Sequence, residues 1–124
     1  MQRGIASHYA KSWTGRKTAN GERLHHDSLT CAHLQHPFGT ILKVSCPETE
    51  KTVYVRVNDR GPYHRHRIID LSWGAAKNLG ILPLGIAEVI VEVCHPVVQA
   101  ELPPVKVYAP WDSLANEPLL PWAP

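Results

Sequence analysis

The sequence of 124 residues contains no apolar run long enough to cross a membrane, and its first residues lack the charged, apolar and cleavage-site parts of a signal peptide. It also contains no internal repeat, no phosphate-binding glycine loop and no Ser-His-Asp order. We therefore expect either a soluble, intracellular protein or one from which a targeting segment has been removed.

Cysteine is scarce, and neither sign of charge dominates. The three cysteines, Cys31, Cys46 and Cys94, allow at most one disulfide and leave at least one free thiol, so the redox compartment stays open. Thirteen Lys and Arg against eleven Asp and Glu give a formal net charge of +2. This near balance favours neither a nucleic-acid binder nor an acidic scaffold.

The length fits one compact domain, which we assign to residues 1–96. Seven of the eleven prolines lie from Pro96 onward, which is typical of an extended arm or a linker. We therefore assign residues 97–124 to a Pro-rich C-terminal arm or linker, and we expect it to be dispensable for chemistry.

Apolar alternation predicts a mainly β structure. The clearest strands are residues 41–45, 51–57 and 86–93, and shorter ones are expected at residues 4–9, at 29–33 and around Ile68 and Ile69. Ser72 suits the N-cap of one short helix that runs through Leu79 and ends at Gly80.

Residues 57–72 contain many polar side chains and follow directly on the apolar strand at residues 51–57. We interpret them as the floor of an active-site groove. Asp59 lies at a strand end, where the chain turns at residues 58–62. Asp70 lies on the next apolar run, so we expect both aspartates to face one cleft. Two alternatives stay open, because Asp59 can cap its own turn and Asp70 can pair with a neighbouring arginine.

Two further polar residues stand out upstream. The Asn20-Gly21 step favours positive φ and presents Glu22 directly after a turn, although a solvated loop charge is an adequate alternative. His33 lies just before a turn beside apolar residues, where histidine is either a packing residue or a functional one.

The remaining histidines do not predict a metal site, although eight in this length raise that question. His25 and His26 are expected to be exposed loop residues. His64 and His66 have no further Cys or His at a spacing that closes a zinc site.

Several motifs in one order resemble the rare lipoprotein A (RlpA) family. They are GIASHY (4–9), TANGE (18–22), LTCAH (29–33), PFGT (37–40), VNDRGP (57–62), RIIDLS (67–72) and the strand at 85–93. The resemblance implies a small six-stranded double-psi β-barrel with one or two short helices.

The resemblance also implies a peptidoglycan lytic transglycosylase of the bacterial cell envelope, either periplasmic or an outer-membrane lipoprotein. Such enzymes cleave the β-1,4 bond between N-acetylmuramic acid and N-acetylglucosamine, favour peptide-free glycan strands and leave 1,6-anhydro ends. The expected partner is therefore a glycan strand. We expect no cofactor, no metal, no nucleic acid and no membrane contact, and we expect a monomer.

The resemblance carries catalytic positions onto Glu22, His33 and Asp59. Asp59 is our choice as the acid and then the base, with Glu22 as the negative partner and His33 as an orienting group, although Glu22 and Asp59 can exchange roles. The residues expected to bind substrate are Asp70, Asn58, Arg60, Tyr63 and Ser7.

A function of a different class is also compatible with these residues. Expansin-like and barwin-like barrels bind or loosen polysaccharide without cleaving it, so the same fold also suits a wall-binding module. An enzyme requires a carboxylate pair in a groove, whereas a binder requires an aromatic platform, for which Trp13, Trp73 and Tyr63 are available.

Overall fold

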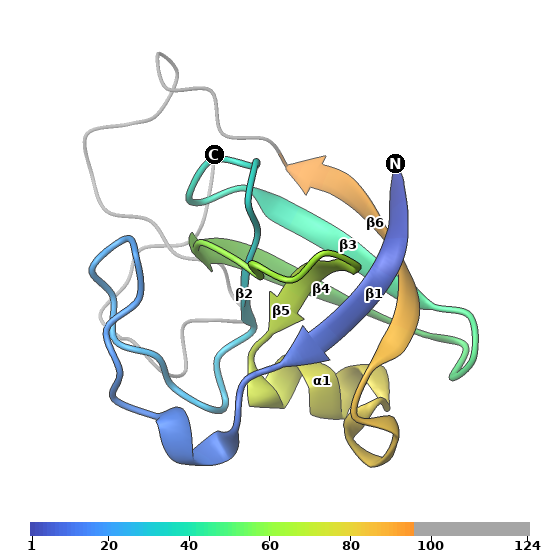
Figure 1. Ribbon diagram of the computed structural model, residues 1–124, viewed down its shortest axis with the longest axis horizontal. Coiled ribbons are helices and arrows are strands. Elements are labelled where there is room, and N and C mark those ends of the chain that lie inside the picture. The colour runs from blue at the N-terminus through green and yellow to red at the C-terminus, as the bar shows by residue number, and fades with distance from the viewer. Residues whose placement is uncertain (96–124) are drawn as a thin grey trace.

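A computed structural model describes residues 1–95 of the chain, with six strands and one helix in that part (Figure 1). The strands are β1 (Gln2–His8), β2 (Thr30–Ala32), β3 (Ile41–Cys46), β4 (Lys51–Asp59), β5 (Arg67–Leu71) and β6 (Ala87–His95). The helix is α1 (Trp73–Leu79), and two short 3₁₀ turns are η1 (Lys11–Trp13) and η2 (Leu82–Leu84). The expected C-terminal arm lies outside the described residues and stays a prediction.

The strands close into a barrel in the order β1-β5-β2-β4-β3-β6 (Figure 1). β1 runs parallel to β5, and β2 runs parallel to β4, whereas the other neighbouring strands are antiparallel. Each parallel pair joins strands that are not consecutive in the chain, so each needs a crossover connection. The expected mainly β, six-stranded barrel is confirmed.

A register shift between β2 and β4 brings Asp59 to the same face of the barrel as Asp70. Ala32 of β2 lies opposite Asp70 of β5 on one side, and a register shift brings it opposite Asp59 of β4, instead of Asn58, on the other. Since directly opposite residues point to the same face of a sheet, Asp59 and Asp70 share a face and lie two strand spacings apart, roughly 10 Å. Ser7 of β1 lies opposite Asp70 and extends this polar row.

Apolar side chains from the other face fill the barrel. Val53, Val55 and Val57 of β4 alternate inward and are buried. Helix α1 covers one end of the barrel (Figure 1). It begins as expected, because Ser72 Oγ accepts a hydrogen bond from the Ala75 amide at 3.2 Å. It ends at Gly80, whose φ of 83° is in the left-handed region that favours glycine.

Strand β4 is longer than expected. Asn58 and Asp59 belong to the strand, so the prediction of a turn at residues 58–62 was wrong for these two. Their backbone carbonyls accept hydrogen bonds from the amides of Asn20 and His33, both at 3.2 Å, and this pairing keeps the backbone extended. Asp59 still lies at the strand end, as predicted.

Two further findings concern the state of the cysteines and whether any helix could cross a membrane. Cys31, Cys46 and Cys94 all have free thiols, the first two buried and the third exposed. Within residues 1–95, no helix has the length and apolar character needed to cross a membrane.

Candidate active site

The connection between β1 and β2 covers the face of the barrel wall that carries Asp59. Its residues Tyr9 and Leu24 pack on Ala32 in a buried apolar cluster separate from the barrel core. The amide of Ala19 donates a hydrogen bond to Asp59 Oδ1 at 2.9 Å. The long loop is therefore the outer wall of the site.

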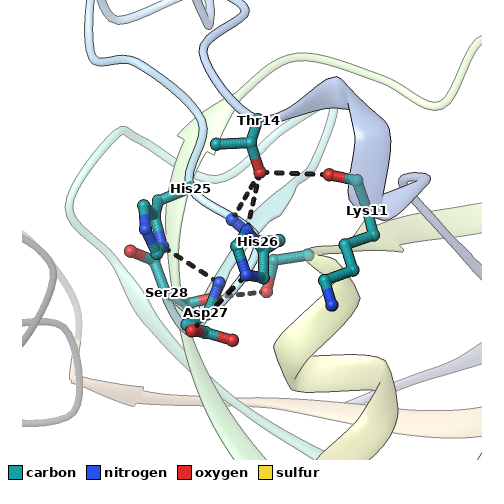
Figure 2. Close-up of polar contacts among 7 residues, drawn as sticks. Lys11, Thr14, His25, His26, Asp27 and Ser28 are labelled. Atoms are coloured by element: carbon teal, nitrogen blue, oxygen red, sulfur yellow. Dashed lines mark hydrogen bonds and ion pairs between the residues drawn. The ribbon is translucent and has the colours of Figure 1, made fainter.

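A polar cluster holds the base of this loop in shape (Figure 2). The Thr14 hydroxyl donates to the Lys11 carbonyl and accepts from the His26 amide, both at 3.1 Å. The His25 and His26 rings stack with their centroids 4.7 Å apart, and His26 Nε2 lies 3.5 Å from the Asp27 carboxylate. Both histidines are half-buried, so the prediction that they are exposed was wrong because these contacts cover them.

Glu22 is held by an ion pair with β4. Arg56 Nη1 donates to Glu22 Oε2 at 2.9 Å, and Asn58 Nδ2 donates to Oε1 at 3.1 Å. Burial alone would raise the pKa of Glu22, but the Arg56 guanidinium and these hydrogen bonds outweigh it and hold the pKa below its ordinary value. Glu22 is therefore ionised at neutral pH, and it is not a solvated loop charge.

Asp59 is half-buried and accepts three hydrogen bonds. The backbone amides of Ala19 and Arg60 both donate to Oδ1 at 2.9 Å. The Tyr9 hydroxyl donates to Oδ2 at 2.5 Å. These donors come from three separate segments of the chain, so they fix the orientation of the carboxylate.

Asp70 is a second acid, and it lies on the same face of the barrel wall as Asp59. It accepts a hydrogen bond from the buried Ser7 hydroxyl, which is the residue opposite it in β1. Burial raises the pKa of Asp70, and the negative charge of Asp59 adds to this, while Ser7 and Arg67 act in the opposite direction. The two aspartates therefore influence one another, and Ser7 is the direct partner of Asp70.

Tyr9 and Arg56 belong to the site but had no role in the sequence interpretation. Burial and the hydrogen bond to Asp59 raise the pKa of Tyr9, so its hydroxyl keeps its proton. Arg56 follows Tyr54 on the polar face of β4, where alternation predicts exposure, yet it is only 8% exposed because the Glu22 loop covers it. The sequence did contain one indication of this, because Arg56 is a charged residue between the valines of β4.

An open pocket of about 300 Å³ lies beside Asp59. Its lining residues are Tyr9, Trp13, Arg16, Lys17, Thr18, Leu24 and Asp59. The rings of Tyr9 and Trp13 are 5.3 Å apart, centroid to centroid, and form an aromatic wall. This volume is at the lower end of the range for small-molecule sites.

The hydrogen bonds of the His33 ring go to Gln2, Gln35 and His36 and not to Glu22, Asp59 or Asp70. Its ring is buried, with Nε2 at 3.0 Å from the Gln2 amide oxygen and Nδ1 accepting from the Gln35 amide at 3.1 Å. Burial, with the nearby His36 and Arg60, lowers the pKa of His33 to about 4. The ring is therefore neutral, and its role in the reaction stays a prediction.

The backbone of His33 does connect to the Asp59 region. The His33 amide donates to the Asp59 carbonyl, and Arg60 Nη1 donates to the His33 and His36 carbonyls at 2.9 and 2.8 Å. The Arg60 guanidinium also lies 4.0 Å from the centroid of Phe38. Tyr63, by contrast, is 81% exposed and free to meet a ligand.

A family model described as lytic transglycolase matches residues 1–91, so the chain belongs to this family. The resemblance to the RlpA family is confirmed by curated relatives named endolytic peptidoglycan transglycosylase RlpA. The one from Campylobacter jejuni is 49% identical over 90 residues, and the one from Vibrio cholerae 46% over 90, each across 73% of this chain. The chain spans 33% and 34% of these two relatives.

Solved structures show the same fold. An apo expansin from Clavibacter michiganensis matches with a TM-score of 0.60 and 24% identity over 77% of this chain and 51% of its own. A Streptomyces papain inhibitor matches with a TM-score of 0.56 and 23% identity over 73% of this chain and 94% of its own. The double-psi β-barrel is thereby confirmed, while identities this low show the fold alone.

Proposed function

We propose that this domain is a peptidoglycan lytic transglycosylase that cleaves the β-1,4 bond between N-acetylmuramic acid and N-acetylglucosamine. The observation that carries this is Asp59, a half-buried carboxylate oriented by three donors at the wall of an open pocket. The family and the names of its relatives supply the substrate class.

Asp59 acts first as the acid that protonates the leaving glycosidic oxygen. It then acts as the base toward the 6-hydroxyl of the muramyl residue, so that the sugar closes on itself as a 1,6-anhydro end. Glu22 supplies the negative charge that steadies the positively charged transition state. Its lowered pKa leaves it without a proton to donate near neutral pH. This favours Asp59 over Glu22 as the acid.

The other expected site residues support these two. Ser7 and Asp70 form a hydrogen-bonded pair on the same face, and Asn58 positions Glu22. Tyr63 is exposed and available to stack on a sugar ring. Arg60 and His33 orient the chain around Asp59 through their backbone contacts.

We infer that the protein acts in the bacterial cell envelope, where the proposed substrate is found, either in the periplasm or as an outer-membrane lipoprotein. We expect it to act as a monomer on peptide-free strands, without cofactor or metal. Within residues 1–95, no three His, Cys, Asp or Glu side chains gather in a way that could hold a metal ion. Activity that survives exhaustive chelation is the expected result.

The second candidate function is a wall-binding module without catalysis. An expansin structure in complex with cellohexaose shares the fold, with a TM-score of 0.59 and 22% identity over 82% of this chain and 52% of its own. The aromatic wall of Tyr9 and Trp13 suits such binding.

The Asp59→Asn variant tests the proposed function, since it keeps the shape of the side chain but cannot hold and return a proton. Purified wild type and variant are incubated with peptide-free glycan strands, and products are read by mass spectrometry. We expect cleavage by the wild type and none by the folded variant. Equal product from both removes Asp59 from the reaction, and binding without product from either favours the wall-binding module.

A further inference from the structure

The pocket beside Asp59 carries an excess of positive charge. Arg16 and Lys17 both line it, against the single carboxylate of Asp59. Both side chains are exposed, and in the part of the chain that the structure describes neither forms an ion pair. Two unpaired cations in the wall of a pocket favour a ligand that brings its own negative charge.

Arg16 is positioned by a ring contact of its side chain and by hydrogen bonds of its backbone. Its guanidinium lies 4.4 Å from the ring centroid of Trp13, and its backbone is bonded on both sides, to the Trp13 carbonyl at 3.0 Å and the Leu24 amide at 2.7 Å. A guanidinium stacked by its face keeps its N–H edges free, and two parallel N–H groups match a carboxylate. The Trp13 ring thus orients the Arg16 guanidinium at the pocket wall.

The proposed substrate offers such a charge, and this inference therefore rests on the proposed function. Each N-acetylmuramic acid bears a lactyl ether on its ring. In the intact wall the lactyl carboxyl is joined to a stem peptide as a neutral amide, and once the peptide is removed it is a free carboxylate. A muramyl ring beside Asp59 therefore brings this group to the pocket wall.

We propose that Arg16 and Lys17 form a subsite for the free lactyl carboxylate of a peptide-free muramyl residue, with Trp13 supporting the Arg16 guanidinium. The amide of a peptide-bearing strand removes the charge that the subsite recognises. The attached peptide also has to fit beside a pocket of about 300 Å³. The subsite is thus a physical basis for a preference for peptide-free strands.

Binding tests this inference separately from cleavage. The probes are peptide-free glycan strands and the same strands with their lactyl carboxylates coupled to methylamine. Titration calorimetry in the Asp59→Asn background measures affinity without consuming the strands. The test variant adds Arg16→Gln and Lys17→Gln, and the matched control adds Lys43→Gln and Lys51→Gln on the hairpin of β3 and β4. Thermal unfolding checks that all are folded.

We expect the test variant to bind the carboxylate strands about three- to tenfold more weakly than its parent, as two exposed ion pairs allow. Its affinity for the methylamide strands should not change, and added salt should reduce the difference. Equal losses on both strands, no loss on either, or no binding of either strand by the parent would overturn the subsite.

Cleavage by the wild type decides the proposed function independently. Carboxylate-dependent binding without cleavage keeps the subsite and rejects the enzyme. Cleavage by the wild type with no effect of Arg16 and Lys17 on either strand keeps the enzyme and rejects the subsite.

Discussion

The Tyr9 hydroxyl donates a hydrogen bond to Asp59 Oδ2 at 2.5 Å, although the two residues are 50 positions apart in the chain. Tyr9 follows β1, and Asp59 ends β4, so this bond joins the loop to the barrel wall. Tyr9 also packs on Ala32, the residue opposite Asp59. The apolar part of Tyr9 thus anchors the loop while its hydroxyl orients the proposed acid.

The Tyr9→Phe variant is expected to fold and to cleave glycan strands about tenfold more slowly, because Asp59 loses one of the three donors that orient its carboxyl group, and a factor of ten is about 1.4 kcal/mol in the barrier. The ring and its packing remain. Initial rates on peptide-free strands measure the effect. Tyr54→Phe on the outside of β4 is the matched control and should react at the wild-type rate. A Tyr9→Phe rate equal to that of the wild type would show that the hydroxyl does not position Asp59.

The strands and the helix could be predicted from local patterns, but the polar contacts of the site could not. Alternation in β4 and the caps at Ser72 and Gly80 are readable because they depend on neighbouring residues. The pairs Tyr9–Asp59 and Glu22–Arg56 join residues 50 and 34 positions apart, and the place of Asp59 also depends on a register shift between β2 and β4. No local pattern specifies those.

The residue types at the site were nevertheless identifiable. Asp59 stood out at a strand end, Asp70 on an apolar run and Glu22 directly after a turn, and the motif order gave all three a family context. The partners that orient them, Tyr9 and Arg56, look like ordinary strand residues until the loop folds over the wall.

The Glu22–Arg56 pair should make stability depend on pH in the acid range. The pKa of Glu22 is lower in the folded protein than its ordinary 4.5, so the unfolded chain binds the proton more readily. The stabilisation is present above about pH 4.5 and is lost as pH falls through the lower, folded pKa. Its size is at most about 1 kcal/mol, since the Glu22 side chain is 41% exposed.

Urea unfolding of wild type and Glu22→Gln at several pH values measures the contribution of the Glu22–Arg56 pair to the free energy of unfolding. The variant should be less stable at pH 7, and the difference should shrink toward pH 3. Glu88→Gln is the control, because the pair of Glu88 with Arg3 is more exposed. A difference between wild type and Glu22→Gln that does not change with pH would contradict the lowered pKa.

His33 should produce a second pH dependence at higher pH. Its folded pKa of about 4 is below the ordinary 6.5, so the unfolded chain binds the proton first. The free energy of unfolding therefore falls as pH falls from about 6.5 to about 4, by at most about 3 kcal/mol. His33→Gln should flatten this slope, whereas His64→Gln, at an exposed position, should not. An unchanged slope in His33→Gln would show that the ring titrates normally.

The chemical identity of the new chain ends tests the central claim most directly. Wild type and Asp59→Asn are incubated with peptide-free glycan strands, and the ends are read by mass spectrometry. Internal attack by the muramyl 6-hydroxyl predicts 1,6-anhydro-N-acetylmuramic acid from the wild type, one water molecule lighter than a hydrolytic end, and none from Asp59→Asn. Reducing ends from the wild type, or anhydro ends at the wild-type rate from Asp59→Asn, would contradict the proposed reaction.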